Sequence, residues 1–89
     1  MIRKENQDDL MKGRVMHNLP GRLRLAAAGL KYLQEESGEI AAELAEIHGV
    51  RRARVTPCTG GVLLEYDEDV LDALELAEQT DLVLARHAM

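Results

Sequence analysis

The sequence contains neither tryptophan nor phenylalanine, and its only aromatic residues are Tyr32 and Tyr66. Its core must therefore be filled by leucine, valine, isoleucine and alanine. The 89 residues can build one modest core but not two. Because residues 1–12 are polar and mixed in charge, we expect a flexible N-terminal arm there and a single domain at residues 13–89.

Cysteine occurs once, at Cys58, which excludes an intrachain disulfide and any site built on two cysteines. A single cysteine fits a reducing compartment. No apolar run approaches the length of a membrane span, and the first residues lack the apolar segment of a secretion signal. We therefore expect a cytoplasmic protein with no direct membrane insertion.

Basic residues are not in excess: 16 acidic side chains oppose 11 basic ones, for a net charge of -5. This balance argues against a general nucleic-acid binder. The sequence also lacks a nucleophile motif, a glycine-rich phosphate loop and a recognisable acid/base pair of carboxylates. We expect a protein that is not an enzyme.

The clearest local structure signal is a β-hairpin at residues 50–67. Its two arms flank the turn at residues 57–60, where proline fixes one φ angle and glycine tolerates a positive one. Apolar and polar residues alternate in both arms, so each arm has a core side and a solvent side. A lone hairpin is marginal in water, and other elements must cover its apolar side.

The remaining elements follow from periodicity. Alternation over residues 14–25 predicts one long strand, with a bulge or kink at residues 19–21 because proline lacks a donor. Apolar residues at three- and four-residue steps predict a helix that Ser37 caps and Gly49 ends. A second helix follows the acidic residues 67–69 and ends near Gln79. For residues 80–86 we favour a closing strand over a continuation of that helix.

This order is that of the ferredoxin-like split βαβ fold, an α+β class: βαββα with a closing β, in one antiparallel sheet with both helices on one face. The apolar phases predict a buried set consisting of Leu23, Leu25, Ile40, Leu44, Val55, Val62, Leu64 and Leu74.

The uncovered sheet face would carry charged side chains from three strands. We single out five of them as candidate partner-binding residues: Arg22, Arg24, Arg52, Arg54 and Glu65. Two interpretations of this face stay open. It is either a solvated ladder of weak ion pairs or a docking surface for a protein.

Two stretches carry a family resemblance. LPGRLRL at 19–25 and HGVRRARVTPCTGGVLLEYD at 48–67 are separated by one helix. They resemble a divergent branch of the heavy-metal-associated (HMA-like) domains, found alone or at the amino end of metal-transporting P-type ATPases. The metallochaperone branch carries C-x-x-C in the loop after its first strand, where two thiolates clamp a soft ion such as Cu(I). Here residues 26–29 read AAAG, so the resemblance implies the fold and a metal-transport setting but no copper site.

His17 and Cys58 are the candidate metal ligands. We expect the first and third strands to run parallel, so that the turn at residues 57–60 lies where the first strand begins, which brings Cys58 toward residues 14–17. One thiolate and one imidazole are too few for a closed four-ligand site. We therefore predict that any specific zinc or nickel binding needs both residues and is coupled to homodimerisation. The alternative is that both are incidental and no site exists.

These features predict a small non-enzymatic HMA-like accessory or regulatory module of metal handling or transport. It would act mainly through contacts with a protein partner, such as a metal transporter or a metal-storage protein. The alternative is a structural homo- or hetero-oligomerisation domain with no metal role. Nucleic-acid binding ranks last, because the solvent side of the predicted sheet has arginines but no aromatic residues for stacking.

Overall fold

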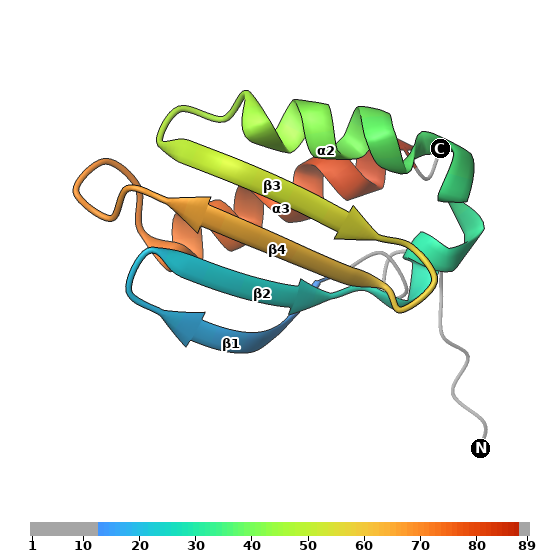
Figure 1. Cartoon of the computed structure of the whole chain (residues 1–89), viewed down its shortest axis with the longest axis horizontal. Helices are drawn as coiled ribbons and strands as arrows, with labels where there is room; N and C mark the ends of the chain where they lie inside the picture. The colour runs from blue at the N-terminus through green and yellow to red at the C-terminus, as the bar shows by residue number, and fades with distance from the viewer. Residues whose placement is uncertain (1–12, 88–89) are drawn as a thin grey trace, which may run out of the picture.

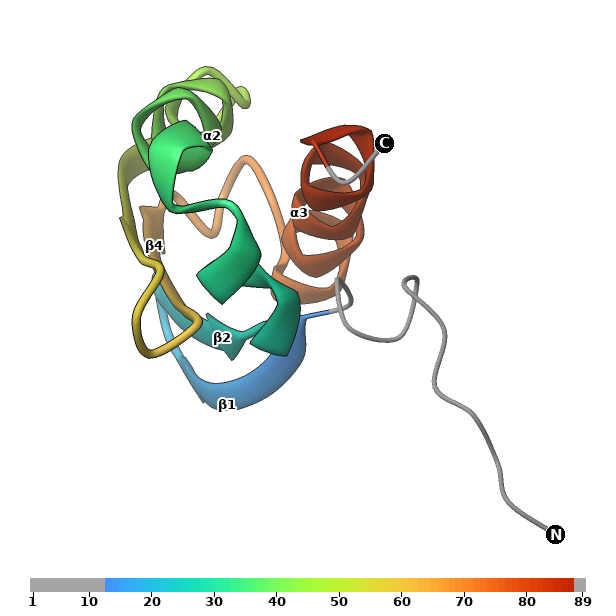
Figure 2. The ribbon, with the colours of Figure 1, turned by 90° about the vertical axis from the view of Figure 1, so that its right-hand side faces the viewer.

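The computed structural model describes residues 13–87, so the arm predicted at residues 1–12 lies outside the described residues. Four strands form one antiparallel sheet in the order β1-β2-β4-β3. The helices α2 and α3 pack on the same side of this sheet (Figures 1 and 2). In chain order the elements are β1 (Arg14–Leu19), β2 (Arg22–Ala26), the 3₁₀ helices η1 (Ala28–Tyr32) and η2 (Gln34–Glu36), α2 (Ser37–Ala45), β3 (Val50–Thr56), β4 (Gly61–Tyr66) and α3 (Ala73–His87).

The split βαβ unit is present as predicted. β4 pairs antiparallel with β2 on one side and with β3 on the other, so β2 and β3 run parallel with β4 inserted between them. The chain crosses from β2 to β3 through η1, η2 and α2. The α+β, ferredoxin-like arrangement is therefore confirmed, and so is the hairpin of β3 and β4.

The predicted long first strand is wrong, because residues 14–26 form a second hairpin. Pro20 and Gly21 make its turn, and Leu19 pairs with Arg22 across it. Gly21 has φ +72°, a left-handed conformation that glycine adopts without strain. The strand irregularity lies between Val15 and His17 instead of at the proline. Proline followed by glycine is thus a stronger signal than the alternation around it.

The predicted closing strand at residues 80–86 is also wrong, because α3 continues to His87. In this chain β1 occupies the sheet edge beside β2, which a C-terminal strand would otherwise take. The helix begins at Ala73 and not after residues 67–69. Asp72 caps it, since its Oδ1 accepts a hydrogen bond of 2.8 Å from the Glu75 amide.

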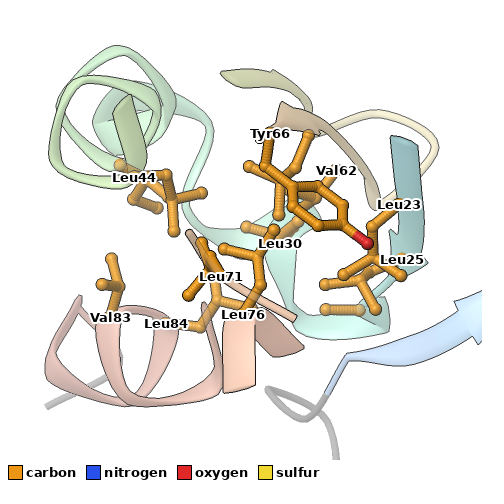
Figure 3. Packing of buried hydrophobic residues seen from close by; sticks show 13 residues of the cluster. Leu23, Leu25, Leu30, Leu44, Val62, Tyr66, Leu71, Leu76, Val83 and Leu84 are labelled. Atoms are coloured by element: carbon orange, nitrogen blue, oxygen red, sulfur yellow. The ribbon is translucent and has the colours of Figure 1, made fainter. Parts of the chain in front are cut away.

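The core lies between the sheet, α2 and α3 (Figure 3). Six of the predicted core residues are buried, Val55 is half-buried, and Leu74 is 72% exposed, which corrects that prediction. The later start of α3 explains the error, because it directs Leu76, Val83 and Leu84 to the core and turns Leu74 outward. The confirmed residues are Leu23, Leu25, Ile40, Leu44, Val62 and Leu64.

Two leucine-to-alanine substitutions test this packing. Leu44 is fully buried on α2, so Leu44→Ala should lower the free energy of unfolding by roughly 2–5 kcal/mol through lost burial and a residual cavity. Leu74→Ala removes the same atoms from an exposed site and should change stability by no more than about 0.5 kcal/mol. Urea titration followed by circular dichroism measures both. Equal losses in the two variants would contradict the helix register.

Candidate functional site

The sheet face opposite the helices carries two arginines on β2 and two on β3. Arg22 and Arg24 are exposed because they alternate with the buried leucines of β2. Arg52 and Arg54 are exposed on β3 for the same reason, since the residues after each of them turn toward the core. Alternation along two strands therefore gathers four guanidinium groups on one surface.

The strand register arranges these arginines in two rows. Arg22 and Arg52 both pair with Glu65 of β4, while Arg24 and Arg54 both pair with Leu63. With neighbouring strands about 4.8 Å apart, the two arginines of one row stand roughly 10 Å apart at their Cα atoms. We call this surface the arginine face, defined by Arg22, Arg24, Arg52, Arg54, Leu63 and Glu65. It holds all five residues that the sequence predicted for partner binding.

The arginine face is positively charged on a negatively charged protein. It has four arginines against one glutamate, whereas the whole chain has a net charge of -5. Within residues 13–87, none of the four arginines forms a salt bridge, so the ion pairs of the first interpretation of this face are not formed there. Arg51 and Arg86 behave differently, since they pair with Asp67 at 3.5 Å and with Glu43 at 2.8 Å.

Two shallow grooves run beside Leu63, which is half-buried at the centre of the face. The smaller groove, about 200 Å³, is lined by His17, Leu19, Arg22, Arg24 and Leu63. The larger groove, about 580 Å³, extends across β3 to the start of α2 and is lined by Ser37, Gly38, Ala41, Arg52, Ala53, Arg54, Val55 and Leu63. Sequence reasoning missed Leu19 and Leu63, because their place between arginines depends on the β1–β2 turn and on the strand register.

Within one chain the structure does not bring His17 and Cys58 together. β2 and β4 run antiparallel, so the parallel orientation assumed for them is wrong. Cys58 is exposed in the β3–β4 turn, whereas exposed His17 lies within the edge strand β1, where it pairs with Arg24 of β2. Strand β2 separates β1, which carries His17, from the β3–β4 hairpin, whose turn carries Cys58. Across residues 13–87, no group of three or more histidine, cysteine or acidic side chains is placed to hold a metal ion.

The loop after β2, where the metallochaperone branch carries its thiolates, is closed by packing. Ala27 is 1% exposed, and its amide donates to the Gly60 carbonyl at 2.8 Å. The two segments approach so closely that a Cβ on Gly60 would stand 2.7 Å from the Ala27 oxygen. Gly29 and Leu30 are buried as well. Residues 26–29 therefore present backbone and methyl groups and no thiolate or imidazole.

A cluster around His87 joins the end of α3 to η2 and α2. The Nδ1 atom of His87 lies 2.8 Å from Glu36 Oε1, and the Nε2 atom of His87 contacts Glu43 Oε2. Arg86 also donates to Glu43, at 2.8 Å. The two carboxylates bind opposite sides of the imidazole ring, so they cannot share one metal ion with it. This cluster clamps the helices, and only the full length of α3 reveals it.

The titration of this clamp follows from its contacts. The hydrogen bond that the His87 ring donates to the Glu36 carboxylate, with a smaller contribution from the one to Glu43, raises the pKa of His87 above its usual 6.5 despite partial burial. The hydrogen bonds from His87 and then Arg86 lower the pKa of Glu43 below its usual 4.5. His87 therefore stabilises the fold fully below pH 6.5 and loses this effect as the pH rises through its raised pKa.

Comparison with protein families shows that heavy metal associated domain 2 matches residues 11–84. This span includes all four strands and most of α3. No curated protein and no solved structure matches the chain. Among residues 13–87, no helix combines the length and apolar character needed to cross a membrane.

The clamp gives a pH-dependent prediction. The stability difference between the wild type and His87→Ala should be largest near about pH 5.5, where His87 is protonated and Glu43 ionised, and smaller at about pH 9. It should also shrink on acidification, as the pH falls through the lowered pKa of Glu43. Urea unfolding at several pH values measures it. His48→Ala, at an exposed histidine beyond α2, is the control. A difference that grows toward pH 9 would contradict the assignment.

Proposed function

This chain belongs to the heavy metal associated domain 2 family and is a metal-associated module, and we propose that it serves metal handling or transport as a non-enzymatic accessory. In this proposal it docks on a protein partner through the arginine face. The partner is a metal transporter or a metal-storage protein, and the docking places or regulates that partner without a catalytic step.

The observation that carries the proposal is the unpaired state of the four arginines within residues 13–87. Each guanidinium offers a planar set of donors, and arginine is enriched in protein interfaces. Leu63 adds an apolar centre between them, and grooves on either side give the face relief. A surface kept only for solubility needs neither the apolar centre nor this segregation of positive charge.

The metal-related features support a docking role over a carrier role. The closed loop after β2 offers no soft ligand, and His17 and Cys58 stand on different parts of the sheet. A module of this kind uses the family fold as a scaffold for recognition. Its charged side chains act as binding groups, while Glu65, its one carboxylate, lies between two arginines.

Site-specific photo-crosslinking in the native host tests this proposal. A photoreactive residue in place of Leu63 should capture a protein of metal transport or storage, and Arg24→Glu with Arg54→Glu should abolish the capture. The same photoreactive residue in place of Leu82, which is 64% exposed on α3, is the control. The proposal fails if both positions capture the same proteins, or if the captured proteins have no part in metal handling.

Homodimerisation is a second candidate function, favoured by the exposed edge strand β1. All six of its residues are exposed, including Val15, Met16 and Leu19 at 52–54%. No other described strand pairs with its outer edge. An unpaired edge offers backbone donors and acceptors to another strand. Pairing of two β1 strands would bring a His17 from each chain toward one seam, where the ligands for zinc or nickel are doubled.

Sedimentation velocity with and without zinc tests this second candidate. The wild type should shift toward dimer when zinc is added, because two chains together supply enough ligands. His17→Ala should abolish the shift, since this pairing places the two His17 side chains at the seam. Cys58→Ser tests the prediction that the site needs both side chains, because β2 separates β1 from the hairpin that carries Cys58. A monomer–dimer balance that zinc leaves unchanged in the wild type would eliminate the metal-coupled dimer.

A further inference from the structure

The arginine face selects one class of partner. Resting on the proposed docking function, we infer that the bound part of the partner is an extended acidic polypeptide segment with apolar residues on the same side as its carboxylates. The carboxylates pair with the arginines, and the apolar residues contact Leu19 and Leu63, which line the smaller groove together with Arg22 and Arg24.

The spacing of the arginines leads to the extended conformation. Arg22 and Arg24 are two residues apart on one strand, as are Arg52 and Arg54. Side chains on one face of a strand repeat every roughly 6.6–6.8 Å. An extended segment with acidic residues at alternate positions has the same repeat, so two of its carboxylates can each meet one arginine. Guanidinium and carboxylate groups then form paired, charge-assisted hydrogen bonds.

The two rows of arginines differ in how strongly they attract an anionic group. Glu65 stands between Arg22 and Arg52, and its negative charge offsets part of their attraction for an anion. Leu63 stands between Arg24 and Arg54, where no carboxylate intervenes. Arg24 and Arg54 should therefore contribute most to binding an acidic partner, and both grooves include Leu63 as a shared apolar wall.

A polypeptide fits this face better than a nucleic acid. Single-stranded nucleic acids are bound by stacking of bases on aromatic side chains. The face has none, because Tyr66 is buried on the opposite side of the sheet and Tyr32 belongs to η1. The net charge of -5 would also repel a long phosphate backbone, whereas a short acidic segment avoids most of this repulsion.

A binding experiment with a defined probe tests the inference. The probe is a fluorescein-labelled peptide with glutamate at two alternate positions, leucine at the next alternate position and serine between them, so that in an extended chain the glutamates and the leucine point to the same side. Its binding to the whole chain is followed by anisotropy. Binding should weaken at least about tenfold in Arg24→Glu with Arg54→Glu, because two positive charges that attract the carboxylates of the probe become negative. It should also weaken as salt is added. Leu63→Ala should weaken binding by a smaller factor.

Two controls separate the arginine face from general charge effects. Arg51→Glu reverses one charge on β3, as each substitution of the double variant does, at an arginine paired with Asp67 outside the face, and should leave binding within about twofold. A peptide with glutamine in place of glutamate should bind at least about tenfold more weakly than the acidic probe. Unchanged melting temperatures in all variants verify that they fold.

Other results would overturn the inference. These are equal binding of the glutamine peptide, an equal loss in Arg51→Glu, or tighter binding of single-stranded RNA of the same length. Self-association that Arg24→Glu with Arg54→Glu abolishes, without peptide binding, would assign the face to a second copy of this chain. If crosslinking at position 63 captures a metal-handling partner through a neutral segment, the proposed function holds and this inference fails. If the acidic peptide binds but crosslinking captures no metal-handling partner, the inference about the bound segment holds and the proposed function fails.

Discussion

The double-sided pairing of β4 is the constraint on which the rest of the structure depends. Every residue of β4 from Gly61 to Glu65 has a partner on β2, and the same strand pairs with β3 on its other side. Its alternation therefore sets both faces of the sheet at once. Val62 and Leu64 enter the core, while Leu63 and Glu65 divide the arginines into two rows. A shift of one residue in this register would exchange the two sets.

The N-terminal hairpin gives the sheet its fourth strand and determines whether residues 80–86 form a strand or extend α3. Because β1 takes the edge beside β2, residues 80–86 are free to extend α3 and pack Thr80, Val83 and Leu84 into the core. The longer helix then reaches far enough for His87 to clamp η2 and α2. One proline–glycine turn near the start of the chain thus accounts for an interaction near residue 87.

Sequence alone was sufficient where a local pattern and the global fold agree. The β3–β4 hairpin, the core side of β2 and the charged face opposite could all be predicted, because alternation assigns faces without knowledge of pairing. The hairpin at Pro20 and the extent of α3 could not be predicted, since each depends on which segment of the chain occupies the sheet edge beside β2. The His87 clamp and the grooves beside Leu63 join residues distant in sequence, and no periodicity signals them.

The separation of charge on this molecule would also affect how the proposed partner reaches it. Three net positive charges on the arginine face leave eight net negative charges on the remainder of the chain, and this separation of charge gives the protein an electrostatic dipole. A dipole turns the molecule during diffusion and presents one side first to a charged target. A negatively charged partner that approaches the other, negative side of the protein is repelled before the two molecules touch. Association should consequently be fast at low ionic strength, and selectivity begins at distances where no side chains yet touch.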